Sequence, residues 1–241
     1  MIQLQNISKS YSGTVKAASN ISLHVKPGEI FGFLGPNGAG KTTTIKMITG
    51  ILYPDHGQII VNGINALEQP LEAKKQFGYV PDNPDLFLRL KGLEYLNFMA
   101  DMYDVPKSLR KERIQHLAAK FDMDKALSDP ILSYSHGMRQ KIVIMGVLIH
   151  DPTLWILDEP LTGLDPKSAH ILKEMMREHT NTGKTVFFST HVLEVAEKLC
   201  DRVAIIHKGA IQFCGTFKEM QLQFQSDHSL ESMFLELTSY E

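Results

Sequence analysis

A glycine-rich motif, Gly35–Thr42 (GPNGAGKT), limits the folds open to this chain more than any other part of the sequence. It fits the pattern G-x-x-x-x-G-K-[ST]. The apolar stretch Glu29–Leu34 comes before it and a helix-compatible stretch, Thr42–Gly50, follows it. A strand, a loop and a helix in this order are the context that a phosphate-binding loop requires. The context therefore favours such a loop over the alternative, a glycine-rich turn that merely caps a helix.

Each residue type in the motif suits the binding of a polyphosphate. Gly35, Gly38 and Gly40 can adopt positive φ angles, which lets backbone N–H groups close around phosphate oxygens. The N-terminus of the following helix adds positive potential. Lys41 is expected to reach the β- and γ-phosphates, and the Thr42 hydroxyl is expected to bind Mg²⁺, a hard ion that prefers oxygen.

Two acidic residues, Asp158 and Glu159, follow the apolar stretch Leu154–Leu157. The ends of strands in parallel sheets face the ligand crevice. Successive residues of a strand point to opposite faces, so the two acids need not share a role. Asp158 is expected to orient Mg²⁺, directly or through water, and Glu159 to accept a proton from a water molecule that attacks the γ-phosphate. Alone, the pair would also fit a solvated strand end; after a phosphate loop it predicts nucleotide hydrolysis.

Strand-like and helix-like stretches alternate along the chain. The strand candidates are Glu29–Leu34, Gln58–Val61, Gly78–Val80, Leu154–Leu157, Thr185–Ser189 and Arg202–Ile206. They are apolar on both faces, which predicts a parallel sheet covered by helices. Between about residues 90 and 149, apolar residues recur at helical spacing and no strand candidate occurs. The predicted fold is an α/β core interrupted by a helical insertion. From Glu219 onward the chain is polar and fits either a short packed helix or a loose tail.

Composition excludes several classes of protein. The chain has 241 residues and a formal net charge of −2, so bulk positive charge for binding nucleic acid is missing. Two cysteines, Cys200 and Cys214, are too few for a disulfide scaffold. No apolar run approaches the roughly 20 residues of a transmembrane helix, and the N-terminus lacks the features of a secretory signal. These observations predict a chain that stays in the cytosol.

Together, these motifs resemble the nucleotide-binding domain of ABC transporters over about residues 1–218. Tyr134–Met138 (YSHGM), followed by Arg-Gln-Lys, matches the position of the family's LSGGQ signature. Leu161–Pro166 matches the D-loop, His191 the switch histidine, and Tyr11 the aromatic residue that stacks on adenine. The phosphate loop and the signature are most similar to those of the ATPase subunits of bacterial type 2 exporters.

The resemblance implies a fold, with boundaries, and a set of site residues. The fold is a P-loop NTPase (RecA-like) core, residues 1–85 and 150–218, with an antiparallel β edge, an inserted α-helical subdomain, 86–149, and a C-terminal tail, 219–241, all forming one ATPase domain. Catalysis is assigned to Glu159, His191 and Lys41, and Mg²⁺ binding to Thr42, Asp82 and Asp158. The ATP-binding residues are Tyr11, Ala17, Asn37, Gly38, Ala39, Gly40, Lys41, Thr42, Thr43, Ser135, Gly137 and Asp165.

The sequence departs from the family pattern at two places. Asp82 stands where the family usually has a glutamine that contacts Mg²⁺ and signals to the membrane partner; Asn83 is the alternative for that role, and a simple turn in Pro-Asp-Asn-Pro is a further one. The signature has Tyr134, His136 and Met138 in place of Leu, Gly and Gln, but it keeps Ser135 and Gly137. His136 is interpreted as a solvated side chain, with a pH-sensitive contact as the alternative.

The resemblance implies an ATP-hydrolysing subunit that drives transport, with export as the expected direction, through a separate transmembrane permease at the cytoplasmic face of the membrane. Two such chains, as a homodimer or with a related ATPase, would sandwich two ATP molecules head to tail, and the Ser135 and Gly137 of each would complete the other's site. Leu86, Phe87, Leu88, Leu90 and Leu93 are expected in the core of the helical insertion or in a groove for the permease. The alternatives are a soluble ABC-type ATPase that acts on ribosomes or DNA, and a regulatory module that does not hydrolyse ATP. No nucleic-acid partner is expected.

Overall fold

Two β-sheets form the centre of the molecule. The computed structural model describes residues 1–11, 15–224 and 229–239. The larger sheet has the strand order β10-β9-β3-β8-β7-β6, in which only the β9–β10 pair is antiparallel. Its strands are β3 (Ile30–Leu34), β6 (Phe77–Val80), β7 (Leu154–Leu157), β8 (Thr185–Thr190), β9 (Arg202–His207) and β10 (Ala210–Gly215).

The second sheet is antiparallel throughout and has the order β2-β1-β4-β5. Its strands are β1 (Ile2–Tyr11), β2 (Val15–Val25), β4 (His56–Val61) and β5 (Ile64–Asn65). The assignment of Gln58–Val61 to the parallel sheet is therefore wrong, because β4 pairs with β1. Ile59 and Val61 are buried, whereas Gln58 is exposed, so the strand has one buried face, as an antiparallel edge sheet requires. The expected α/β fold with an antiparallel edge is confirmed.

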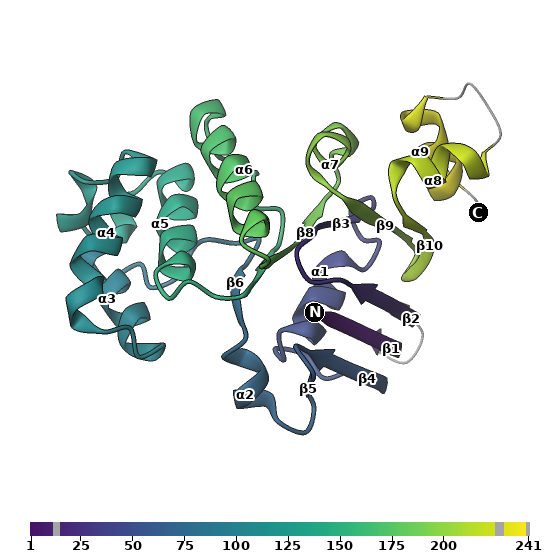
Figure 1. The fold of residues 1–241 in the computed structure, drawn as a ribbon, viewed down its shortest axis with the longest axis horizontal. Helices are drawn as coiled ribbons and strands as arrows, with labels where there is room; N and C mark the ends of the chain where they lie inside the picture. Colours follow the sequence, from purple (N-terminus) through teal and green to yellow (C-terminus); the bar gives the residue numbers. More distant parts are fainter. Residues whose placement is uncertain (12–14, 225–228, 240–241) are drawn as a thin grey trace.

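Helices cover both faces of the larger sheet. They are α1 (Lys41–Ile48), α2 (Pro70–Lys74), α3 (Gly92–Met102), α4 (Lys107–Phe121), α5 (His136–Leu148), α6 (Pro166–Asn181), α7 (Leu193–Leu199), α8 (Phe217–Gln223) and α9 (Leu230–Ser239), with short 3-10 turns at Ala126–Ser128 and Ile131–Ser133. Neighbouring strand residues alternate between two cores: Phe187 packs with α1 and the antiparallel sheet, whereas Phe188 packs with α3 to α6. Figure 1 shows α3, α4 and α5 together at one end of the molecule.

The C-terminal residues that the structure describes form packed helices rather than a loose tail. Met220 on α8 and Met233 on α9 are fully buried against strands β9 and β10. Thr216 caps α8 and exchanges hydrogen bonds with Glu219, which defines the start of that helix. Figure 1 shows this helical pair at the opposite end of the molecule from α3 and α4.

Two stacked histidines give the fold an acid-sensitive stability. The His150 ring stacks on Tyr103 and the His179 ring on Trp155, with centroid distances of 3.6 and 4.1 Å. Burial lowers the pKa of each histidine to about 4. An exposed histidine in the unfolded chain has a pKa of about 6.5. Protons therefore bind the unfolded chain more readily, and stability is lost as the pH falls from about 6.5 towards 4.

We expect each of these histidines to lower the free energy of unfolding by about 1–2 kcal/mol between about pH 7.5 and about pH 5. Urea denaturation at both pH values measures the loss. His150→Phe keeps an aromatic ring on Tyr103 but does not titrate, so its loss should be smaller than that of the wild type. Equal losses in the two proteins would show that His150 does not contribute.

Candidate nucleotide-binding site

The glycine-rich motif forms a loop between β3 and α1. Lys41 is the first residue of α1 and is 7% exposed, and its ammonium donates hydrogen bonds to the carbonyl oxygens of Gly35 at 2.8 Å and Pro36 at 3.2 Å. Gly38 and Gly40 have positive φ angles of 79° and 108°. Gly35 does not, and glycine is needed there because a Cβ would collide with the carbonyl oxygen of Ile206. The Lys41 ammonium is thus held against the backbone carbonyls of the loop. The space beside Gly38 is open, since a Cβ there would have no atom within 4 Å.

The two acidic residues leave strand β7 in different directions. Asp158 is fully buried, and the Ser189 hydroxyl on β8 donates a 2.5 Å hydrogen bond to its Oδ1. The same hydroxyl accepts a 3.0 Å hydrogen bond from the Glu159 N–H. Ser189 therefore fixes both acids relative to the neighbouring strand. Sequence reasoning missed this residue, although its position two before His191 is a usable signal.

Burial raises the pKa of the Asp158 carboxyl, while the hydrogen bond from Ser189 and the nearby Thr42 hydroxyl act in the opposite direction. The other oxygen of Asp158, Oδ2, is buried without a hydrogen-bond partner among the described residues. A buried carboxylate oxygen without a partner is costly. A cation bound at Oδ2 would relieve that cost and favour the charged carboxylate.

Glu159 lies between a lysine and a histidine. Its Oε1 is 3.4 Å from the Lys41 ammonium, and its Oε2 is 3.1 Å from Nδ1 of His191. Its φ angle is 48°, in the left-handed region that a glutamate rarely occupies. Holding a residue there costs on the order of 1–3 kcal/mol and is found mostly at functional sites. The strained backbone aims the carboxylate at the loop, where a proton acceptor would be needed.

A cavity of about 240 Å³ opens at this point. Its lining is Ala17, Asn37, Gly38, Gly40, Lys41, Thr42, Thr43, Asp82 and Glu159, all of them predicted site residues. Ala39 is predicted too, but its side chain is buried beside the loop. His191 lines an adjoining cavity of about 230 Å³ that shares Glu159. Tyr11 is 45% exposed and is outside the lining of both cavities.

Asp82, rather than Asn83, faces the cavity. Asn83 instead accepts a 2.9 Å hydrogen bond from the N–H of Asp85 and so closes a turn. The segment therefore combines two of the expected alternatives: a turn at Asn83 and an acid at the cavity in Asp82.

The signature residues are not part of this cavity. Ser135 caps helix α5, where its hydroxyl accepts a 3.3 Å hydrogen bond from the Met138 N–H, and its side chain is exposed. His136 is exposed as expected, but its ring lies against Gly163 so closely that a Cβ at Gly163 would collide with it. The cavity of this single chain therefore lacks the predicted Ser135 and Gly137 contacts.

Asp165 also lies outside the cavity, where its carboxylate already has several partners. It caps α6 by accepting hydrogen bonds from Ser168 N–H and Oγ at 2.9 and 2.8 Å, and it pairs with Lys141 at 2.9 Å. The hydrogen bond from Lys141 is the main cause that lowers the pKa of Asp165. Within one chain this side chain serves as a helix cap rather than a nucleotide contact.

Comparisons with known proteins decide the family. The model of the family described as ABC transporter matches residues 18–162. The ATP-binding protein EcsA of Bacillus subtilis is 39% identical over 91% of this chain and 89% of its own length. The chain belongs to the ABC transporter ATP-binding family. It is an ATP-binding subunit and an ATPase, and domains of this family dimerise and work with transmembrane subunits.

Solved structures agree with this membership. An ATP-binding subunit of an ABC transporter superposes with a TM-score of 0.93 at 34% identity, covering 98% of this chain and 99% of the other. The ATP-binding cassette MJ0796, solved as a dimer after hydrolysis with ADP and phosphate, gives a TM-score of 0.81 over 90% of this chain and 98% of its own. At 23% identity, the second likeness supports the fold alone.

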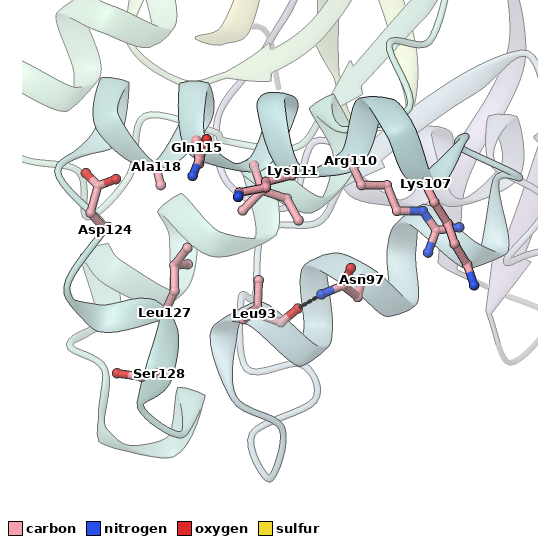
Figure 2. A pocket seen from close by; sticks show the side chains of 11 residues that line it. Leu93, Asn97, Lys107, Arg110, Lys111, Gln115, Ala118, Asp124, Leu127 and Ser128 are labelled. Atoms are coloured by element: carbon pink, nitrogen blue, oxygen red, sulfur yellow. Dashed lines mark hydrogen bonds between the residues drawn. The ribbon is translucent and has the colours of Figure 1, made fainter.

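A hollow larger than the nucleotide cavity lies elsewhere on this ABC ATPase. It has a volume of about 730 Å³ and lies between α3, α4 and the turn at Ala126–Ser128. Figure 2 shows Lys107 and Arg110 near one end of this groove, Lys111 near its middle and Asp124 at the other end. It contains none of the predicted nucleotide-site residues, but its lining includes Leu93, which was expected in the helical core or in a groove for the permease. Among the described residues, no helix combines the length and the apolar composition that crossing a bilayer requires.

Proposed function

We propose that this ABC ATPase hydrolyses ATP at the Lys41 cavity with Glu159 as the general base. The observation that carries the proposal is the placement of the Glu159 carboxylate between Lys41 and His191, at 3.4 and 3.1 Å. Lys41, Asn37 and the backbone from Gly38 to Thr43 bind the phosphates, while Tyr11 and Ala17 bind the base and ribose end. His191 holds Glu159 in place and approaches the γ-phosphate. Glu159 takes the proton of the attacking water.

Mg²⁺ fits beside Asp158, with Thr42 and Asp82 as the other protein ligands. The orphaned, buried Oδ2 of Asp158 supports this position. Among the described residues, no three His, Cys, Asp or Glu side chains form a metal cluster, so phosphate oxygens and water would fill the remaining positions. Mg²⁺ commonly binds in this way in nucleotide sites, and it neutralises charge on the phosphates.

A second copy of the chain completes the site in this proposal. Ser135 and Gly137 lie at the N-terminus of α5, where a helix favours anions, yet they are outside the cavity of their own chain. Because one chain carries both the loop and the signature, two copies arranged head to tail make two complete sites. We propose the homodimer because it needs no second kind of ATPase chain.

The partner in the membrane is a transmembrane permease, and we place the ATPase at the cytoplasmic face with export as the direction. The export assignment rests on the similarity of the phosphate loop and the signature to type 2 exporters. Phe87 and Phe98 are 47% and 38% exposed, with ring centroids 5.3 Å apart, and Leu86 and Met102 are exposed as well. Leu88 and Leu90 are half-buried against the helical core. The exposed set is the proposed permease surface.

Phe98→Glu is expected to weaken co-purification of the ATPase with its permease by about tenfold, because a charge would replace apolar contact area. The measurement is the amount of ATPase that is recovered when its tagged permease is pulled down from detergent-solubilised membranes. Leu222→Glu is the matched control, since Leu222 is also exposed but lies on α8 at the other end of the molecule. Equal loss in both variants would remove this surface from the interface.

A further inference from the structure

The segment between β6 and α3 connects three parts of the molecule. Asp82 lines the nucleotide cavity, and Leu86 and Phe87 belong to the exposed apolar surface. Between them, Asp85 points to a third part, the helix that carries the signature. Its N–H donates to Asn83 Oδ1 at 2.9 Å, so the turn fixes the direction in which Asp85 leaves the segment.

Arg139 on α5 is the partner of Asp85. One terminal nitrogen of its guanidinium lies 2.7 Å from Asp85 Oδ1, and the other donates a 2.8 Å hydrogen bond to the carbonyl oxygen of Leu132. The Arg139 side chain is 21% exposed, which is well shielded for an arginine. A guanidinium held at two points has a defined direction, unlike a mobile surface lysine.

The backbone links this ion pair directly to Ser135. The Arg139 N–H donates a 2.9 Å hydrogen bond to the Ser135 carbonyl oxygen, so the two residues are one helical turn apart. A helical turn is stiff, so a shift of Arg139 shifts Ser135 with it. On its other side, the same turn is held by Lys141, which pairs with Asp165 at 2.9 Å.

We propose that Arg139 is a positioning residue that ties the signature to the Asp82 segment of its own chain through Asp85. When Asp82 is seated at the nucleotide cavity, the ion pair sets the position in which Ser135 is presented to the second copy. Nucleotide binding at the site of one copy thereby controls how tightly the Ser135 of that copy binds the ATP of the second copy. This inference rests on the proposed homodimer, in which Ser135 contacts the partner's nucleotide.

The effect of the Arg139–Asp85 ion pair on dimerisation can be separated from its effect on the stability of the fold. A partly exposed ion pair contributes about 0–1 kcal/mol to folding. Removing it should therefore change the melting temperature little. Its effect should instead appear in the assembled state, where a displaced Ser135 loses its contact with the phosphate.

The test uses the full chain with Glu159→Gln, which is expected to retain ATP. Arg139→Asp and Asp85→Arg are added singly and together, and Lys75→Asp is the control, because it breaks an ion pair with Glu72 on the distant helix α2. ATP-driven dimerisation is measured by analytical ultracentrifugation, nucleotide affinity by titration with a fluorescent ATP analogue, and folding by thermal denaturation. Arg139→Gln is the milder substitute should a reversed charge prevent folding.

We expect each single reversal to raise the protein concentration for half-dimerisation by about tenfold, while the nucleotide affinity of the monomer, measured below that concentration, is unchanged. The double reversal should restore most of the loss, and Lys75→Asp should have no effect. If the single variants dimerised like their parent, or if the double variant dimerised as weakly as the single variants, the role of Arg139 would be overturned. The proposed homodimer would be unaffected by that result. A parent that stays monomeric with ATP would overturn the proposed homodimer, and this inference with it.

Discussion

Glu159→Gln is expected to lower ATP turnover by about 10²–10⁴-fold while ATP binding is retained. The amide keeps the size and most of the hydrogen bonding of the carboxylate, but it cannot take a proton from water. The position of Glu159 between Lys41 and His191 supports this prediction. Phosphate release at saturating ATP and Mg²⁺ measures turnover, and titration with a fluorescent ATP analogue measures binding.

Glu197→Gln is the matched control for this variant. Glu197 is exposed on α7, so its substitution should leave turnover at the wild-type rate. If Glu159→Gln also hydrolysed ATP at the wild-type rate, Glu159 would not be the base. Loss of both binding and turnover would instead indicate a damaged cavity.

Lys41→Ala should weaken ATP binding by about 10- to 100-fold, the range expected when a charged hydrogen bond worth about 1.5–3 kcal/mol is lost. In the structure the ammonium is held by two loop carbonyls, and it lies beside Glu159. Its main role is thus to supply charge to the cavity rather than to support the core. We expect the melting temperature to change much less than the affinity for ATP.

Lys46→Ala provides the comparison on the same helix. Lys46 lies in the last turn of α1 and does not line the cavity. Its variant should bind ATP like the wild type, as measured by the same titration. Similar affinities for the wild type and Lys41→Ala would contradict the assignment of the phosphate loop.

Local sequence patterns predicted most of the strands and the phosphate loop, whereas Ala17 and Asp82 were assigned to the site by the family resemblance. The residues of the phosphate loop are contiguous in the chain, so their proximity follows from the sequence. A glycine-rich stretch between a strand and a helix also has few other structural explanations. Asp158 and Glu159 follow because strand ends in a parallel sheet meet at one edge. The error at Gln58–Val61 has a physical cause: a run of only three apolar residues cannot reveal whether one or both faces are buried, because only its pairing with β1 decides that.

Local sequence patterns could not predict the contacts between segments that are distant in the chain. The link from Ser189 to both acids spans about 30 residues, and the Arg139–Asp85 pair joins residues 54 apart in the chain. The helix cap at Asp165 is a further feature that the family motif does not reveal, and the predicted nucleotide contact of Asp165 stays a prediction. His136 is exposed, as the sequence predicts, and its contact with Gly163 depends on a loop that folds back from beyond β7.

The central claim is that ATP joins two copies of this chain, each supplying Ser135 and Gly137 to the other's site. Sedimentation of Glu159→Gln with ATP and Mg²⁺ tests it most directly. The account predicts a species of twice the monomer mass that holds two ATP molecules and reverts to monomer when ATP is removed. A protein that binds ATP at Lys41 but stays monomeric at every concentration would contradict the account.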